Sequence, residues 1–150
     1  TVGSGGSSSI SFSSIPSTYK HLQIRCLVRG AYGLIVINSD TTTTYRRHWL
    51  YGDGASTGAG SDTSTNGWDV IDSSNTANIF GVNIVDILDY TNTNKNKTFR
   101  TLSGGDYNGS GEITLYSGAF YNTSAISSLN LSMSSGNFNT ATKFALYGIK

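Results

Sequence analysis

The stretch of residues 20–29 reads KHLQIRCLVR and constrains the fold of this chain more than any other segment. Its apolar residues recur at every second position, whereas a helix would need them three and four positions apart. Successive side chains of a strand point to opposite faces, so this alternation predicts a strand with one buried face. Leu27 is the one apolar residue on the polar side. The alternating apolar residues are Leu22, Ile24, Cys26 and Val28.

Short apolar runs separated by turn signals continue through the rest of the chain. Gly, Ser, Thr and Asn are frequent, Pro16 is the single proline, and no helical period of useful length occurs. Strands with turns about every 8–12 residues are typical of sandwiches and barrels. The sequence therefore predicts an all-β fold, a single jelly-roll-like antiparallel β-sandwich of about 8–10 strands. The predicted strands are residues 10–12, 20–29, 34–37, 45–51, 68–71, 79–88, 98–103, 112–121, 126–131 and 144–149.

Length and local composition predict the domain organisation. A chain of 150 residues fits one domain and can bury a substantial core. Residues 1–9 are mostly Gly and Ser, a composition that is flexible unless something holds it. We therefore expect a flexible N-terminal segment at residues 1–9 and a β-sandwich domain at residues 10–150.

The charge pattern argues against nucleic acid and membrane partners. The net charge is +1, and the densest basic group is only Arg46, Arg47 and His48, whereas nucleic acid binding usually needs a concentrated basic patch. No apolar run approaches the roughly 20 residues that a membrane span requires. Cys26 is the only cysteine, which excludes a disulfide within the chain and a Cys-based zinc site.

No residue pattern points to a reaction. Both histidines, His21 and His48, lie in strand patterns, and there is no G-x-S-x-G segment, although a triad assembled only in space stays open. Asp53 and Asp106 lie beside glycines and could bind calcium, but neither segment matches an EF-hand loop. Asp and Gly are also common in turns for conformational reasons. The sequence predicts a protein that is not an enzyme and has no cofactor or metal.

Partner contacts are expected at the edge strands, the loop at residues 52–67, the N-terminal segment and the aromatic residues. Residues 52–67 show no apolar pattern and are expected to form a long loop, and loops of this length are often functional. Tyr and Trp are enriched at interfaces because one end is apolar and the other polar. As aromatic residues, Tyr116 and Phe120 could also contact sugars or a protein partner. The candidate partner contacts are Arg46, Trp49, Tyr51, Asp53, Trp68 and Tyr121.

Six segments together resemble the virion structural domains of tailed bacteriophages. The resemblance runs through nearly the whole chain in the same order, with a tighter turn before residue 34. It implies no catalytic residues. The segments are SISFSSIPSTYKHLQIR at residues 9–25, INSD at 37–40, WLYGDG at 49–54, NTANIFG at 75–81, SGAFYNTSAISSLNL at 117–131 and FALYGIK at 144–150.

This resemblance implies a non-enzymatic structural role in a virion, on the head or on the tail, and we expect the capsid surface rather than the tail. The first hypothesis is a capsid decoration (cement) protein that binds the major capsid protein or other virion proteins and stabilises the head. The alternative is a tail-fibre or receptor-binding module that recognises host surface glycans through exposed aromatic residues. A glycan depolymerase is the third hypothesis. A homo-oligomer is expected, with a trimer among the candidate assemblies.

Overall fold

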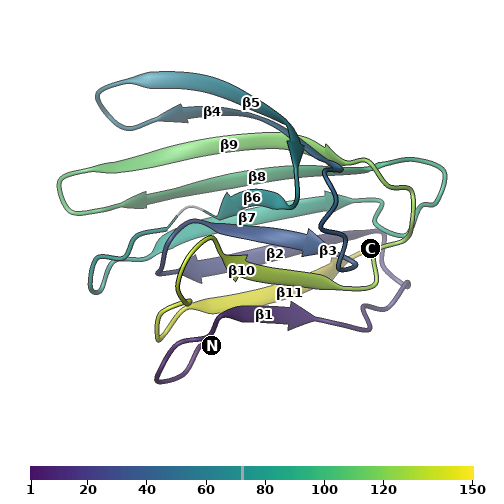
Figure 1. Cartoon of the computed structure of the whole chain (residues 1–150), viewed down its shortest axis with the longest axis horizontal. Helices are drawn as coiled ribbons and strands as arrows, with labels where there is room; N and C mark the ends of the chain where they lie inside the picture. The colour runs from purple at the N-terminus through teal and green to yellow at the C-terminus, as the bar shows by residue number, and fades with distance from the viewer. Residues whose placement is uncertain (72) are drawn as a thin grey trace.

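The computed structural model describes residues 1–71 and 73–150, and this part of the chain folds into eleven strands arranged in two antiparallel sheets (Figure 1). The four-stranded sheet contains, in order, β1 (Ser9–Phe12), β10 (Leu129–Met133), β3 (Gly33–Ile37) and β6 (Trp68–Ile71). The seven-stranded sheet contains, in order, β11 (Lys143–Ile149), β2 (His21–Val28), β7 (Gly81–Leu88), β8 (Lys97–Asp106), β9 (Gly111–Phe120), β4 (Tyr45–Gly52) and β5 (Thr57–Thr65).

The strand order confirms the predicted all-β sandwich of jelly-roll type. The chain changes sheet between β1 and β2, between β2 and β3 and between β3 and β4, and β1 lies beside β10, which is far away in the sequence. In the larger sheet, the consecutive strands β7, β8 and β9 fill the place between β2 and β4. This meander and the added edge strand β11 bring the described strands to eleven, more than the 8–10 expected.

The core lies between the two sheets, and the alternation in β2 is the feature that positions it. Leu22, Ile24 and Val28 are at most 2% exposed, and Cys26 is 5% exposed, so the predicted buried face is confirmed. We call the side of the seven-stranded sheet that packs on the smaller sheet its inner face. Other fully buried residues there are Tyr45, Val85, Ile87, Phe99 and Phe120.

The prediction of a long loop at residues 52–67 is wrong, because most of this segment forms the strand β5 (Thr57–Thr65). This strand pairs with β4 at the edge of the larger sheet, opposite residues with large aromatic side chains. A Cβ added to Gly60 would lie 2.3 Å from the Trp49 ring, and one added to Gly58 would lie 2.5 Å from the Tyr51 ring. The neighbouring strand therefore supplies the apolar cover that β5 itself lacks.

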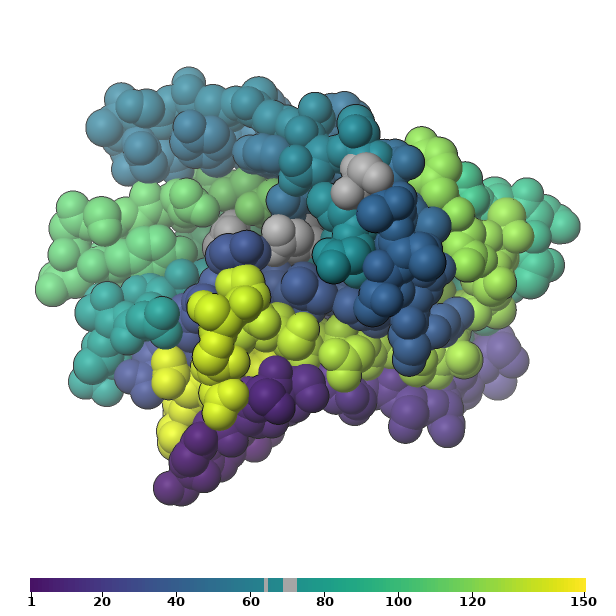
Figure 2. Space-filling view, in the orientation of Figure 1, coloured from purple at the N-terminus to yellow at the C-terminus, as the bar shows by residue number. Residues whose placement is uncertain are grey.

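Residues 1–9, expected to be flexible unless held, are held by the segment that precedes β11. Val2 is 4% exposed, its N–H donates to the Thr142 carbonyl at 2.8 Å, and its carbonyl accepts from the Ala141 N–H at 3.0 Å. Ser7 and Phe138 exchange two backbone hydrogen bonds. Figure 2 shows the N-terminal segment lying against the C-terminal part of the chain.

Candidate functional site

The outer face of the seven-stranded sheet carries apolar side chains that face solvent. Leu50 and Ile113 are each 61% exposed, and Val82 is 52% exposed. In a sheet with one solvated face these positions are usually polar. We call this set the outer-face patch: Leu27, Leu50, Val82, Ile84, Leu102, Ile113 and Leu115.

Strand register makes the outer-face patch continuous. Ile84 of β7 pairs with Leu102 of β8, Leu102 pairs with Leu115 of β9, and Leu115 pairs with Leu50 of β4. Residues directly opposite each other on neighbouring antiparallel strands have Cβ atoms about 4.5–5.5 Å apart. Four strands that are separate in the sequence therefore contribute to one apolar row.

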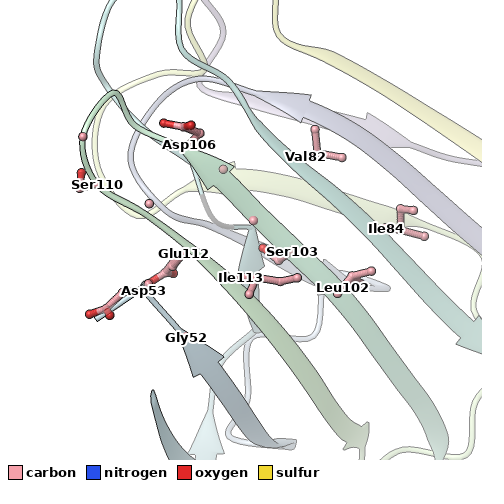
Figure 3. Close-up of a pocket in the computed structure, with 15 residues that line it drawn as sticks. Gly52, Asp53, Val82, Ile84, Leu102, Ser103, Asp106, Ser110, Glu112 and Ile113 are labelled. Carbon is pink, nitrogen blue, oxygen red and sulfur yellow. The ribbon is translucent and has the colours of Figure 1, made fainter. Parts of the chain in front are cut away.

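An open depression of about 750 Å³ lies at one end of the outer-face patch (Figure 3). Val82, Leu102 and Ile113 form part of its apolar lining. The turn after β4 and the turn between β8 and β9 form its rim, with Asp53 and Asp106 at that end. The site is thus an apolar surface bordered by two acidic turns.

The acidic residues of the rim hold their own turns in shape. The Asp53 carboxylate accepts hydrogen bonds from the N–H groups of Ser56 at 2.6 Å and Ala55 at 2.9 Å. These backbone hydrogen bonds lower the pKa of Asp53, so its carboxylate stays charged. The Asp106 carboxylate accepts from the Asn108 N–H at 2.9 Å. Both turns therefore present negative charge beside the depression.

A polar row borders the other side of the outer-face patch. The Asp86 carboxylate accepts from Gln23 Nε2 at 2.8 Å and from Arg100 Nη2 at 2.9 Å. Burial raises the pKa of Asp86, but these two hydrogen bonds and the charges of Arg100 and Arg25 outweigh it and lower the pKa. Charge in this row is therefore compensated within the chain, in contrast to the acidic rim.

The structure places the candidate contact residues in separate locations. Asp53 lies on the rim of the depression. Arg46 lies 5.2 Å from the ring centroid of Tyr121, which is 55% exposed, at the end of β9 away from the rim. Trp49 and Tyr51 lie on the inner face, on the part of β4 that leads to the β4–β5 turn.

Trp68 is not a contact residue, so that prediction is wrong. Its side chain is fully buried, stacks on Phe99 with ring centroids 5.0 Å apart, and donates from Nε1 to Thr101 Oγ1 at 3.2 Å. A Cβ added to Gly118 would lie 2.2 Å from its ring. Trp68 therefore fills the space that this glycine leaves between the two sheets.

The two histidines considered for catalysis lie in separate places, and His21 lies beside a carboxylate, with its Nδ1 3.6 Å from Asp89 Oδ1. His21 and His48 lie on β2 and β4, with β7, β8 and β9 between them. His21 accepts from the Asp89 N–H at 2.9 Å through Nδ1, while His48 is exposed on the outer face. Within residues 1–71 and 73–150, no three His, Cys, Asp or Glu side chains are placed to hold a metal ion.

The same described residues include no helix with the length and apolar character that a membrane crossing demands.

Sequence reasoning missed the outer-face patch, although a signal for it exists. Ile113 and Leu115 alternate with Tyr116 and Phe120 within one predicted strand, so both faces of that strand are apolar. A strand that is apolar on both faces needs cover on both. In this fold the smaller sheet covers only the inner face.

No protein family model matches the chain, and comparisons with curated proteins and with solved structures give no match either.

Proposed function

We propose that this chain is a non-enzymatic structural protein of a phage virion, a capsid decoration protein that attaches to the head through its outer-face patch. The observation that carries the proposal is the continuous apolar row across β7, β8, β9 and β4, with side chains such as Leu50 and Ile113 61% exposed. Exposed apolar patches of this kind mark interaction sites in soluble proteins. The resemblance of six segments to virion structural domains supports the setting.

The size of the outer face suits such an attachment. Seven strands about 4.8 Å apart, each roughly eight residues long with a rise of about 3.3 Å per residue, span roughly 900 Å². A standard protein interface buries about 800 Å² on each partner. The outer face alone is therefore large enough for a specific interface.

The negative charge beside the outer-face patch indicates which charge the partner surface should carry. Asp53 and Asp106 place two carboxylates at one end of the depression. A partner surface on the major capsid protein with apolar side chains and a neighbouring Lys or Arg would complement it. Several copies bound to one shell would add avidity, and the proposal includes a homo-oligomer on the head surface, such as a trimer.

The proposal is tested by adding purified protein to expanded heads that lack it. Cosedimentation measures binding, and thermal disruption of the heads measures stabilisation, because a ligand of the assembled state raises its stability. The double substitution Leu50→Ser and Ile113→Ser is expected to weaken binding at least about tenfold. Tyr32→Ser is the matched control, because Tyr32 is 55% exposed but lies in the turn before β3.

Two results would contradict the proposal. Wild-type protein that neither sediments with the heads nor protects them from heat would remove the decoration function. Binding that the double variant retains in full would show that the outer-face patch is not the attachment surface.

A further inference from the structure

The strand β5 is the one long edge of the two described sheets that is left open. It has nine residues and pairs only with β4, at the margin of the seven-stranded sheet (Figure 1). In an edge strand, the N–H and C=O groups of alternate residues point away from the sheet and can pair with another strand. The pairing with β4 is uninterrupted from Thr57 to Asp62, and the register shifts only beyond it. Residues 57–62 therefore offer a regular stretch of open edge.

The other three edges of the described sheets are short or blunted. β1 and β6, at the margins of the four-stranded sheet, have four residues each. β11 begins with Lys143 and is followed by Lys150, and Val2 makes two backbone hydrogen bonds with the residues that lead into it. Short length and lysine side chains are means by which proteins protect a sheet edge. β5 contains neither Lys nor Pro.

The charge of β5 does not oppose an approaching copy of itself. Asp62 is its only charged residue, and the Asp62 carboxylate accepts a hydrogen bond from Arg47 Nε at 2.8 Å. Like charges placed opposite each other on paired strands are destabilising. Because the charge of Asp62 is compensated within its own chain, two β5 strands can meet without that cost.

Two copies of β5 also fit each other in shape. Opposite residues of antiparallel strands share a sheet face, so inner-face residues meet inner-face residues. A two-fold axis at Ala59, for example, places Gly58 of one copy opposite Gly60 of the other. Tyr51 leans over Gly58 and Trp49 over Gly60, so the rings of both copies would lie over a junction lined by glycine. Apolar contact among these rings adds to the backbone hydrogen bonds.

We propose that β5 pairs with β5 of a second copy of this chain, so that the two seven-stranded sheets join in a two-fold dimer. Because the opposite edge is blunted, the pairing closes at two copies and does not extend into a filament. Residues 57–62 span roughly 20 Å of a sheet about 10 Å thick, which gives roughly 200 Å² of edge on each copy. This is well below the approximately 1,000 Å² of a stable interface, so the dimer is weak in solution. A trimer would need a different contact.

The symmetry of this dimer keeps both outer-face patches on the same side. Antiparallel pairing within one sheet requires the two-fold axis to be perpendicular to that sheet, so the outer faces of the two copies adjoin. One dimer can therefore meet a shell at two places, which raises the avidity of attachment. This consequence rests on the proposed function, whereas the dimer itself does not.

The test is sedimentation velocity of the whole chain, without phage heads, from about 1 µM to about 1 mM. We expect the wild type to change from monomer to dimer within this range. The double substitution Ser61→Lys and Thr63→Lys adds two charges at exposed positions of β5 and should weaken the dimer at least about tenfold. The matched control, Thr98→Lys with Ser134→Lys, adds the same charge at exposed positions outside the edge strands and should dimerise as the wild type does.

Hydrogen exchange at the two ends of the concentration range locates the contact. Amide protection that increases with concentration is expected within residues 57–63. The proposal is overturned if the wild type remains a monomer, if the β5 lysine variant dimerises unchanged, or if the protection appears elsewhere. It is also overturned if Leu50→Ser with Ile113→Ser abolishes the dimer, since self-association would then use the outer-face patch. Binding to heads is measured separately, so failure of the dimer leaves the proposed attachment standing.

Discussion

The two faces of the seven-stranded sheet are both apolar, but the chain covers only one of them. On β8, Phe99 points inward and is 1% exposed, whereas Leu102 points outward and is 47% exposed. On β9, Tyr116 is 8% exposed on the inner face and Leu115 is 45% exposed on the outer face. The same strands therefore present one face that stabilises the fold and another that remains available to a partner.

This difference separates what folding requires from what binding requires. Residues of the inner face should control stability, because they are buried in the isolated chain. Residues of the outer-face patch should control association and contribute little to stability, because they stay exposed until a partner covers them. Five predictions challenge this division, beginning with the largest expected effect.

Cys26 on the inner face should resist alkylation far more than a cysteine placed on the outer face. Burial raises the pKa of the Cys26 thiol to about 12, so at pH 8 its thiolate fraction is lower by a factor of about two thousand than that of a thiol with an ordinary pKa near 8.5. A Leu102→Cys variant supplies the exposed comparison, and iodoacetamide labelling followed by mass spectrometry measures both rates. Equal rates at the two sites would contradict the division.

The raised pKa of Cys26 also predicts how the stability of the protein changes at alkaline pH. The folded-state pKa of Cys26 lies above its value in the unfolded chain, so its contribution to stability is complete below about pH 8.5. The contribution is then lost as pH rises toward the folded-state value. Cys26→Ala should remove this part of the alkaline decline in urea unfolding, while other groups retain theirs.

Phe99→Ala should lower the free energy of unfolding by about 3–5 kcal/mol, because it leaves a cavity beneath Trp68. The matched change on the outer face, Leu102→Ala, should cost about 0.5 kcal/mol or less. Urea denaturation followed by circular dichroism measures both. Comparable losses for the two variants would mean that the outer face is buried in the isolated protein, for example by self-association.

Lys97 is a polar residue on the inner face whose substitution should also be costly. It is fully buried, and its Nζ donates to the carbonyls of Asn92 at 2.6 Å, Thr123 at 2.9 Å and Lys95 at 3.2 Å. Lys97→Met would leave these carbonyls without their donor and should lower stability by about 1–3 kcal/mol.

Lys95→Met is the control for Lys97, because the side chain of Lys95 is 53% exposed and its ion pair with Asp89 is at the surface. It should change stability by about 0.5 kcal/mol or less. If both lysine variants lose the same stability in urea, the three carbonyl contacts of Lys97 are not what holds the loops before β8 and after β9 together.

The smallest expected effect on stability belongs to the outer-face patch itself. The double variant Leu50→Ser and Ile113→Ser should keep the free energy of unfolding within about 1 kcal/mol of the wild type. It should bind less of a dye that fluoresces on apolar surfaces, and it should remain soluble at higher concentration. A large loss of stability with unchanged dye binding would show that these side chains serve the fold.

The sequence could predict the fold class because burial imposes a spacing of two on strands such as β2. Leu22, Ile24, Cys26 and Val28 carry that spacing within the eight residues of His21–Val28. The sequence could not reveal β5, since its cover comes from Trp49 and Tyr51 on the neighbouring strand. Trp68 was misassigned for a similar reason, because the space for its ring is created by Gly118, fifty positions away.

The outer-face patch illustrates the same limit. Within residues 112–121, either set of alternating side chains could have been the buried one. The pairing of β9 with β4 and β8, and the position of the smaller sheet, decide that Tyr116 and Phe120 face inward. Exposure of Ile113 and Leu115 is therefore a property of the assembled sandwich and not of the local sequence.

A cryo-electron microscopy map of expanded phage heads to which the purified protein has been added would test the central claim most directly. The account predicts that the outer surfaces of β7, β8, β9 and β4 lie against a protein of the shell, with Leu50 and Ile113 inside the interface. A map in which these strands face open solvent while another part of the molecule makes the attachment would contradict it.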